Sequence, residues 1–493
     1  MSRKIGIIGG GFGGLSAAIR LAKLGFNVDL FEQNETVGGK ANSISLDGFR
    51  FDTGPSLLTM PCVLNELFDF VDEEINDYIQ LQSLDILCKY FYSDGLTVNA
   101  YSDRGKLINE FSTKFGESEK LIEKYLNYSK QIYDLTAELF LFKSFSEIST
   151  FFNLSALKTL LQINKLDTFR TMHVANESFF NNKKAIQLFD RYATYNGSNP
   201  YLAPATLNII QHVEYNLGAF IAKKGIYSIS LSLESIAKNV GVNIYKSSKV
   251  EQILHEKKRV DGLLINGNVK KYHAIISNSD VNNTYKNLLG DNSSKSAIKY
   301  SKLQPSSSAI VFYWGVKGNY DNLEIHNILF SEDYQNEFDE IFTKKSIPSD
   351  PTIYIYVSSK FNSEDAPPNS ENWFVMLNAP FNSGQEWKIE IEKLREIIIR
   401  KIERQLGISL RENIVCESIL NPLKIESKTS SMYGSLYGIS SNNKYAAFLR
   451  QRNRSKEYKG LYFCGGSAHP GGGIPLVLLS GKITAELVEK DFK

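Results

Sequence analysis

The chain has 493 residues, of which 42% are hydrophobic and 22% charged, with a formal net charge of +2. This length predicts two or three domains, because one domain commonly takes about 150 residues. Charges that nearly balance exclude the strongly basic surface of a nucleic-acid-binding protein, so no nucleic-acid partner is expected.

The cysteines and histidines give no sign of a disulfide framework or a metal site. The four cysteines form no C-x-x-C pair, and no histidine pair has the H-E-x-x-H spacing. We therefore expect no metal and a reducing, cytoplasmic setting. No secretory signal pattern precedes the first strand, and no apolar run reaches the roughly 18 residues that span a bilayer. The protein is expected to be soluble or to lie on a membrane without crossing it.

The N-terminal segment has the pattern of a βαβ unit. Residues 4–8 form an apolar strand pattern, residues 15–24 carry apolar side chains at helical spacing, and residues 28–32 return to a strand pattern. Gly25 follows the helix where a left-handed C-cap is usual.

The rest of the chain alternates between helical and β-rich stretches. Residues 117–190 contain no Gly or Pro and have helical periodicity, which predicts a helical insertion. Short β-rich segments return at 241–278, 309–314, 353–357 and 373–377. A strand at 461–464, a glycine-rich turn and a final helix close the chain. This alternation is typical of an α/β protein.

The turn between the first strand and helix, Gly9-Gly10-Gly11-Phe12-Gly13-Gly14, is a dinucleotide-binding signature. Gly9 allows a tight turn, Gly11 lets the backbone approach a pyrophosphate, and Gly14 permits close packing of helix on strand. The helix N-terminus adds partial positive charge for the phosphates. Glu32 ends the second strand, where an acid accepts hydrogen bonds from a ribose diol and disfavours a 2′-phosphate.

A second glycine motif follows directly. Gly38-Gly39-Lys40, and then Gly54-Pro55 after a short strand, resemble the flavin-containing amine oxidase and carotenoid desaturase superfamily. In that superfamily this segment packs along the cofactor, which favours FAD over a transiently bound nicotinamide carrier.

A third motif lies near the C-terminus, where residues 460–475 form a strand, a glycine-rich turn and a helix start. This pattern predicts a second set of backbone N–H groups that face the cofactor, at Gly465, Gly466, Gly473 and Ile474. This block resembles the C-terminal signature of phytoene-desaturase-type carotenoid oxidoreductases.

Two central segments extend the same resemblance, at 191–205 and 214–225, although Lys224 stands where that family usually has a glycine. The sequence of residues 191–195, Arg-Tyr-Ala-Thr-Tyr, is most similar to the corresponding segment of 3,4-desaturases that act on hydroxylated acyclic carotenoid ends.

The resemblance implies an α/β fold in three parts. These are a discontinuous Rossmann-like FAD-binding domain (1–75, 225–290 and 455–493), a β-sheet substrate domain (76–116, 191–224 and 291–454) and a helical, membrane-facing insertion (117–190). It also implies that the backbone of Val250 contacts the adenine edge and that the N–H of Ile474 approaches the flavin.

The implied activity is desaturation of an acyclic carotenoid, with hydride transfer to FAD, loss of a proton and reoxidation by oxygen or a quinone. The alternatives are a phytoene desaturase, a flavin amine oxidase and a non-catalytic FAD-binding delivery protein similar to Rab escort factors. The complete cofactor motifs at both ends of the chain argue against the last.

Three residues are candidates for acid–base work. Glu147 stands where phytoene desaturases have the acid of an Arg-Asp pair, with Ser146 in place of the arginine. Asp190 and Arg191 form another polar pair, for which a salt bridge on a helix surface is the competing interpretation.

The apolar stretches 139–145 and 148–152 are candidates for contact with a membrane surface. The alternative is a buried helix that lines a substrate tunnel, and the two interpretations are compatible if the mouth of the tunnel lies at the membrane.

Overall fold

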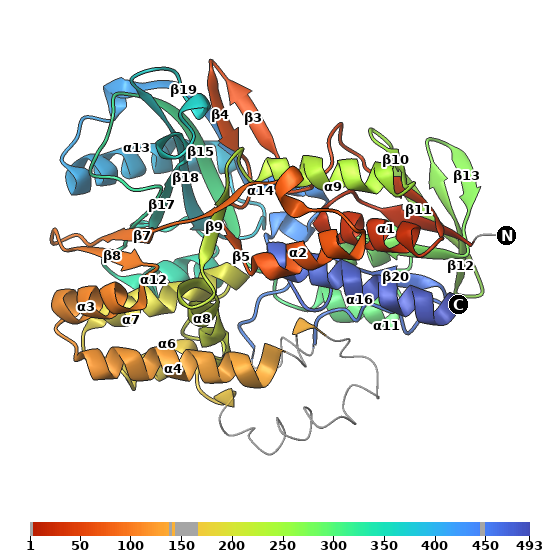
Figure 1. The fold of residues 1–493 in the computed structure, drawn as a ribbon, viewed down its shortest axis with the longest axis horizontal. Helices are drawn as coiled ribbons and strands as arrows, with labels where there is room; N and C mark the ends of the chain where they lie inside the picture. The colour runs from red at the N-terminus through yellow and green to blue at the C-terminus, as the bar shows by residue number, and fades with distance from the viewer. Residues whose placement is uncertain (1–2, 138–140, 143–165, 444–448) are drawn as a thin grey trace.

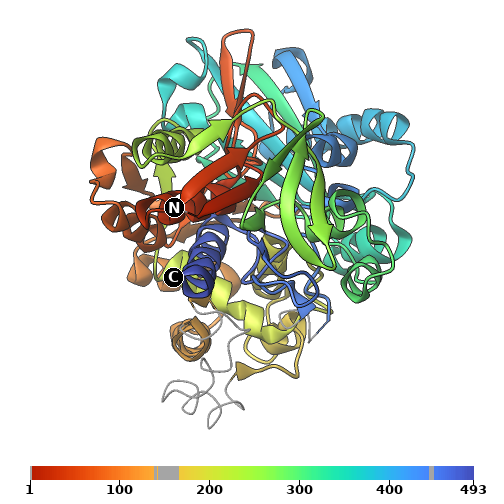
Figure 2. The same cartoon turned by 90° about the vertical axis from the view of Figure 1, so that its right-hand side faces the viewer.

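The computed structural model describes residues 3–137, 141–142, 166–443 and 449–493. A parallel sheet forms one end of the molecule, and both chain termini lie beside it (Figures 1 and 2). Its strands, in spatial order, are β10 (Asn243–Tyr245), β2 (Asn27–Phe31), β1 (Lys4–Ile8), β14 (Ala274–Ser277) and β20 (Leu461–Phe463). These strands come from distant parts of the chain, so the α/β unit that contains the parallel sheet is discontinuous in sequence. The exact domain boundaries stay a prediction.

The parallel sheet is buried on both faces, as all-parallel sheets generally are. One face packs on helices α1 (Phe12–Lys23), α9 (Tyr227–Asn239) and α16 (Ile474–Phe492). The other face packs on an antiparallel sheet of β11 (Val250–Glu256), β12 (Arg259–Ile265) and β13 (Asn268–Lys271). Gly6 of β1 lies under this second layer, where a Cβ atom would come within 3.0 Å of both Leu263 and Tyr272.

A larger mixed sheet forms the other end of the molecule (Figure 1). Its spatial order is β19 (Ile414–Leu420), β15 (Ser308–Lys317), β18 (Ser370–Ala379), β17 (Ile353–Val357), β16 (His326–Leu329), β7 (Ile86–Phe91) and β8 (Thr97–Tyr101). Neighbouring strands are antiparallel except β16 and β7, which run parallel. Trp314, Trp373 and their apolar neighbours pack one face on α13 (Trp387–Leu406). Because side chains alternate along a strand, the next residues face the other way, toward the centre of the molecule.

Two small sheets lie between these ends. One pairs β3 (Ser43–Leu46) with β4 (Phe49–Asp52), and the other has the order β5 (Leu58–Thr59), β9 (Ala219–Ala222) and β6 (Leu81–Ser83).

Helices form a separate layer below the mixed sheet (Figure 1). They are α3 (Arg104–Phe115), α4 (Glu119–Thr136), α6 (Met172–Glu177), α7 (Lys183–Asp190), η5 (Arg191–Asn196), η6 (Ala205–Asn208) and α8 (Ile209–Tyr215). The side chains of Asp103 and Ser118 cap α3 and α4 by accepting from backbone N–H groups. Helices α4, α6 and α7 confirm the predicted helical character in the described part of 117–190.

The remaining helical segments connect these layers. They are α2 (Pro61–Phe70), η1 (Ile75–Asp77), α10 (Val281–Asn283), η7 (Thr284–Leu288), α11 (Lys295–Ser301), α12 (Tyr334–Asp339), η8 (Glu340–Lys344), η9 (Ser358–Lys360), η10 (Ser363–Asp365), η11 (Arg411–Asn413), α14 (Pro422–Thr429) and η12 (Met432–Gly434).

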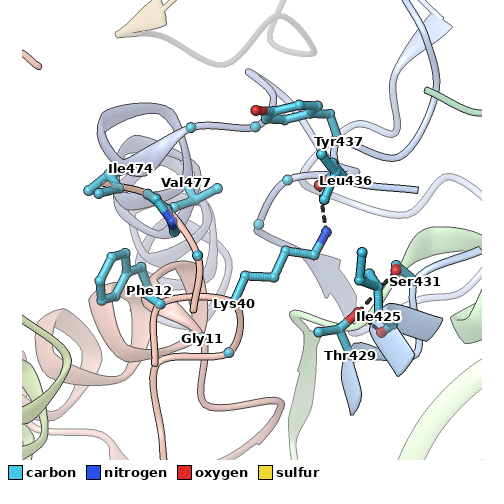
Figure 3. Close-up of a pocket in the computed structure, with 18 of the residues that line it drawn as sticks. Gly11, Phe12, Lys40, Ile425, Thr429, Ser431, Leu436, Tyr437, Ile474 and Val477 are labelled. Atoms are coloured by element: carbon cyan, nitrogen blue, oxygen red, sulfur yellow. Dashed lines mark hydrogen bonds between the residues drawn. The ribbon is translucent and has the colours of Figure 1, made fainter. Parts of the chain in front are cut away.

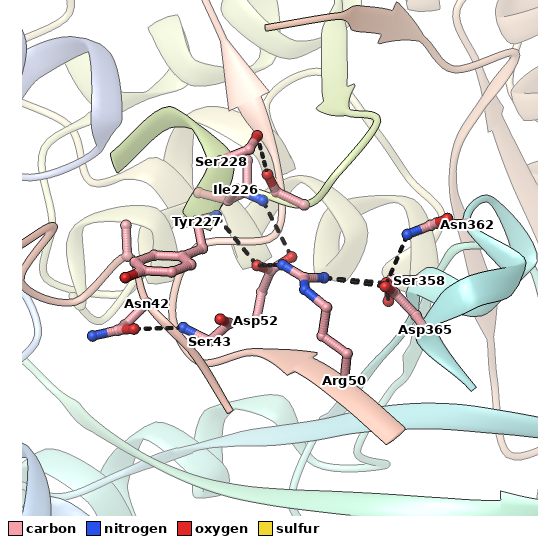
Figure 4. A network of polar contacts seen from close by, with 12 residues as sticks. Asn42, Ser43, Arg50, Asp52, Ile226, Tyr227, Ser228, Ser358, Asn362 and Asp365 are labelled. Atoms are coloured by element: carbon pink, nitrogen blue, oxygen red, sulfur yellow. Dashed lines mark hydrogen bonds and ion pairs between the residues drawn. The ribbon is translucent and has the colours of Figure 1, made fainter. Parts of the chain in front are cut away.

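A buried ionic network joins the two ends of the molecule through β4 (Figure 4). Arg50 pairs with Asp52 at 2.7 Å and with Asp365 of η10 at 3.2 Å. The carboxylate of Asp52 also accepts from the backbone N–H groups of Ile226 and Tyr227 at the start of α9. Burial raises the pKa of Asp52, and Arg50 opposes that shift. The network therefore ties α9, beside the parallel sheet, to η10 near the mixed sheet.

Candidate functional site

The first glycine turn forms an open helix N-terminus. Gly11 is the N-cap of α1 and no side chain caps the helix there, so first-turn N–H groups stay available to an anionic ligand. A Cβ atom at Gly14 would lie 2.1 Å from the carbonyl oxygen of Gly9. Gly14 therefore serves the packing of the turn, while Gly9, Gly11, Phe12 and Gly13 line a cavity.

Glu32 lies at the carboxyl end of β2, buried at the edge of the same cavity. One carboxylate oxygen accepts from the backbone N–H of Gly10 at 2.8 Å, and the other accepts from the N–H of Asn34 at 2.9 Å. The carboxylate thus fixes the glycine turn as well as standing where a ribose would bind. The contact with the glycine turn was not predicted, and the contact with a ribose stays a prediction.

The second glycine motif packs directly on the first. Gly38 donates its backbone N–H to the carbonyl of Gly10 at 2.8 Å, and a Cβ atom at Gly39 would lie 3.3 Å from the Cα of Gly11. The Lys40 side chain crosses the cavity to the carbonyls of Ser435, at 3.2 Å, and Leu436 (Figure 3). Burial lowers the pKa of Lys40 to about 8, against the opposing charge of Asp280.

The C-terminal motif completes the enclosure from the other side. Gly473 is the N-cap of α16, again with no side-chain cap, and Ile474 begins the helix beside Phe12 (Figure 3). A Cβ atom at Gly13 would lie 2.9 Å from the backbone nitrogen of Gly465. The first and last helices of the chain therefore point their open N-termini into one space.

Asn278 holds these turns together and was missed at the sequence level. Its amide donates to the carbonyl of Gly9 at 3.2 Å, and its side-chain oxygen lies 2.3 Å from where a Cβ atom would stand at Gly465. The available signal was its position directly after a strand of the parallel sheet, since ligands bind beyond the carboxyl ends of such strands.

One cavity of about 1590 Å³ connects these elements. The predicted cofactor residues that line it are Gly9, Gly11, Phe12, Gly13, Glu32, Gly38, Gly39, Lys40, Gly54, Pro55, Val250, Gly465, Gly466, Gly473 and Ile474. Single ligand pockets commonly measure about 300–1,000 Å³, so this volume exceeds what one drug-sized ligand needs.

The same cavity continues along the inner face of the mixed sheet. Val311 and Tyr313 of β15, Phe374 and Met376 of β18 and Tyr354 of β17 line it there. Leu141 also lines it, whereas the other residues of the stretches 139–145 and 148–152, except Phe142, lie outside the described residues. The result is a long, largely apolar extension of the cofactor space.

A buried ion pair also lines the cavity. Arg191 of η5 and Glu214 of α8 are 3.0 Å apart, and the Glu214 carboxylate also accepts from the hydroxyls of Tyr192 and Tyr195. Arg191 donates to the hydroxyl of Tyr90 at 3.0 Å. The positive charge of Arg191 and the negative charge of Glu214 thus neutralise each other, and tyrosine hydroxyls bond to both groups. A buried ion pair needs such additional hydrogen bonds to offset the loss of water.

Of the three candidate acid–base residues, the structure describes Asp190 and Arg191, and these two do not pair with each other. Glu147 lies outside the described residues. Asp190 is buried, accepts from Asn176 at 2.8 Å and shares a 2.6 Å hydrogen bond with His173, but it does not line the cavity. The interpretation of Asp190 and Arg191 as a helix-surface salt bridge is wrong, because both are buried and Arg191 pairs with Glu214.

Within the described ranges, no group of three or more His, Cys, Asp or Glu side chains could hold a metal ion. No described helix is long and apolar enough to cross a membrane.

The model of the flavin-containing amine oxidoreductase family matches residues 12–489. The chain belongs to this family. It is 44% identical to a 1-hydroxycarotenoid 3,4-desaturase of Flavobacterium sp. over 99% of each chain. It is 33% identical to a 4,4′-diaponeurosporene oxygenase of Staphylococcus haemolyticus over 99% of this chain and 97% of that one. A solved putrescine oxidase with bound putrescine shares the fold, with a TM-score of 0.65, 14% identity and 99% of each chain covered.

FAD is the cofactor of this flavin-containing family member, and the residues present fit it. The uncapped N-terminus of α1 suits the pyrophosphate, and the uncapped N-terminus of α16 suits the flavin. Glu32 suits the ribose, and glycines stand where side chains would obstruct the space.

Proposed function

We propose that the protein is an FAD-dependent carotenoid 3,4-desaturase that acts on a 1-hydroxylated, acyclic carotenoid end. The observation that carries this proposal is the continuity of the cavity, from the cofactor motifs to the apolar face of the mixed sheet. The name and 44% identity of the Flavobacterium relative support the choice of substrate. A phytoene desaturase and a flavin amine oxidase are the alternatives.

Desaturation removes a hydride from one carbon and a proton from its neighbour. FAD, when bound, supplies the acceptor for the hydride. The apolar wall of Val311, Tyr313, Phe374 and Met376 holds the hydrocarbon in place and excludes water, which is the main requirement of such a step.

The proton needs a separate acceptor. Arg191 lines the cavity, but a guanidinium stays protonated and has no acceptor atom, so it orients its neighbours. Asp190 is engaged by His173 and Asn176. Of the three candidates, Glu147 is therefore the proposed proton acceptor.

A membrane surface supplies this lipid-soluble substrate, and the protein is cytoplasmic and membrane-associated in this proposal. Phe169, Val174 and Leu202, named here the apolar patch, are 87%, 47% and 51% exposed. The backbone of Met172 donates to Ala203 at 2.9 Å, which places the segments that carry the patch side by side. Exposed apolar groups gathered in this way favour contact with a bilayer. Oxygen or a membrane quinone reoxidises the flavin.

The substrate assignment is tested in cells that accumulate defined acyclic carotenoids. We expect the 1-hydroxylated carotenoid to lose two hydrogen atoms by mass spectrometry, and phytoene to remain. Consumption of phytoene with the hydroxylated carotenoid untouched would contradict the assignment. Addition of oxygen without loss of hydrogen would instead indicate the activity named for the staphylococcal relative.

A further inference from the structure

A polar site, named here the recess, lies in the largely apolar wall that the mixed sheet gives to the cavity. His326 begins β16, and Tyr354 lies on the neighbouring strand β17, and both line the cavity. The Nδ1 atom of His326 and the hydroxyl of Tyr354 share a hydrogen bond of 2.7 Å. The Tyr354 hydroxyl also bonds to the Oγ of Ser56 at 2.6 Å. Ser56 follows Pro55 of the cofactor motif, so the recess lies close to the flavin side of the cavity.

The other ring nitrogen of His326, Nε2, is buried and has no hydrogen-bond partner among the described residues. The side chain is only 3% exposed, and its ring stacks on Tyr356 with centroids 5.0 Å apart. Burial and the nearby charge of Arg191 lower the pKa of His326 to about 3, so the ring is neutral at physiological pH. A buried polar atom without a partner costs about 1–3 kcal/mol. An unpartnered atom of this kind, on a side chain that lines a ligand cavity, points to a group on the ligand.

The surroundings of the recess select the chemistry of that group. The ion pair of Arg191 and Glu214 is closed on itself, with tyrosine hydroxyls on both partners, and leaves no free charge to bind an ion. In a neutral imidazole, Nε2 either donates or accepts, depending on which nitrogen carries the proton. A hydroxyl does both, and therefore fits either tautomer.

We infer that His326 Nε2 binds the hydroxyl on the end of the carotenoid, and so selects hydroxylated ends and sets the bond that meets the flavin. This inference rests on the proposed function. In a 1-hydroxylated end only one carbon separates the hydroxyl-bearing carbon from the 3,4 bond. The hydroxyl must therefore bind close to the flavin, where the hydrogen bonds from Ser56 through Tyr354 place His326. Tyr354 is a positioning residue for the imidazole.

The test compares two substrates that differ only in the hydroxyl, a 1-hydroxylated acyclic carotenoid and its counterpart without that group, with purified FAD-loaded protein. His326→Phe keeps a planar ring but removes Nε2. We expect kcat/KM for the hydroxylated carotenoid to fall about tenfold or more, as loss of one buried hydrogen bond implies, with little change for the counterpart. His326→Gln, whose amide reaches the position of Nε2, should recover most of the preference.

Tyr356→Phe is the matched control, because it changes the ring beside His326 and lies outside the cavity lining. It should keep the wild-type preference, and the flavin content of every variant is measured from its absorbance. Equal losses on both substrates for His326→Phe, or a preference that survives it, would overturn the role of His326. If the wild-type protein desaturates neither carotenoid, the proposed function itself fails.

Discussion

The close approach at Gly14 illustrates how single residues shape the cofactor space. Its missing Cβ atom would lie 2.1 Å from the Gly9 carbonyl, a backbone atom that cannot move aside. Gly13 and Gly465, which both line the cavity, also approach each other closely, since a Cβ atom at Gly13 would lie 2.9 Å from the backbone nitrogen of Gly465. The volume available to a pyrophosphate therefore depends on the absence of side chains at these positions.

Gly14→Ala should disrupt this turn. We expect overpacking to destabilise the protein by about 1–3 kcal/mol, with loss of most bound FAD. Flavin absorbance of the purified protein and its Tm measure both effects.

Gly105→Ala is the matched control, since Gly105 also lies in the first turn of a helix, α3. Its Cβ atom would meet nothing closer than Asp103 at 3.4 Å. The control should retain FAD and gain up to about 1 kcal/mol from better helix propensity. Full FAD content in Gly14→Ala would show that the turn relaxes without consequence.

At the scale of elements, strand β4 carries a buried carboxylate, that of Asp52, which connects α9 on one side with η10 on the other. Asp52 accepts from the start of α9 and pairs with Arg50, which also contacts Asp365. Gly225 leaves room for this contact, because a Cβ atom there would lie 2.3 Å from Arg50.

Asp52→Ala should be strongly destabilising. It leaves the N–H groups of Ile226 and Tyr227 without their acceptor and removes one partner of Arg50, at a cost of about 3–5 kcal/mol. Chemical unfolding measures the loss.

Asp134→Ala removes an exposed partner of Lys130 within one helix and serves as the control. It should change the free energy of unfolding by less than about 0.5 kcal/mol. Equal effects of the two substitutions would mean that the β4 network contributes no more than a surface pair.

The helices and strands that are determined by the pattern of neighbouring residues were predictable from the sequence. The βαβ unit, the strands at 353–357 and 373–377 and the helical character near α4 follow from periodicity and glycine placement. The position of the glycine motifs at the cavity was predictable because these motifs occupy short, contiguous segments.

The substrate side of the cavity was not predictable in the same way. Arg191 and Glu214 are brought together by the packing of η5 on α8, and no local pattern marks their pairing. A single histidine such as His326 looks like any core residue until the fold places it in the cavity wall and leaves its Nε2 atom without a partner among the described residues.

At the scale of the whole molecule, two large sheets and a helical layer make up the fold (Figure 1), and one cavity connects the cofactor motifs with the mixed sheet. Val174 of the apolar patch belongs to α6 in the helical layer. In the proposed function, the apolar patch is the surface that contacts the bilayer.

Replacing Phe169 and Leu202 of the apolar patch by serine should weaken membrane association. We expect a several-fold lower bound fraction in flotation with phospholipid vesicles, because two exposed apolar side chains no longer enter the interface. Val415→Ser is the control, since Val415 is 55% exposed on β19. Unchanged flotation of the double variant would contradict a membrane contact at this patch.

The central claim is that a flavin and a polyene meet in the cavity. It is tested most directly by mixing the FAD-loaded protein with a 1-hydroxylated acyclic carotenoid in the absence of oxygen and quinone. We expect the absorbance of oxidised flavin to bleach while one desaturated carotenoid forms for each flavin reduced. A flavin that stays oxidised with this substrate, yet is bleached by a simple amine, would contradict the account.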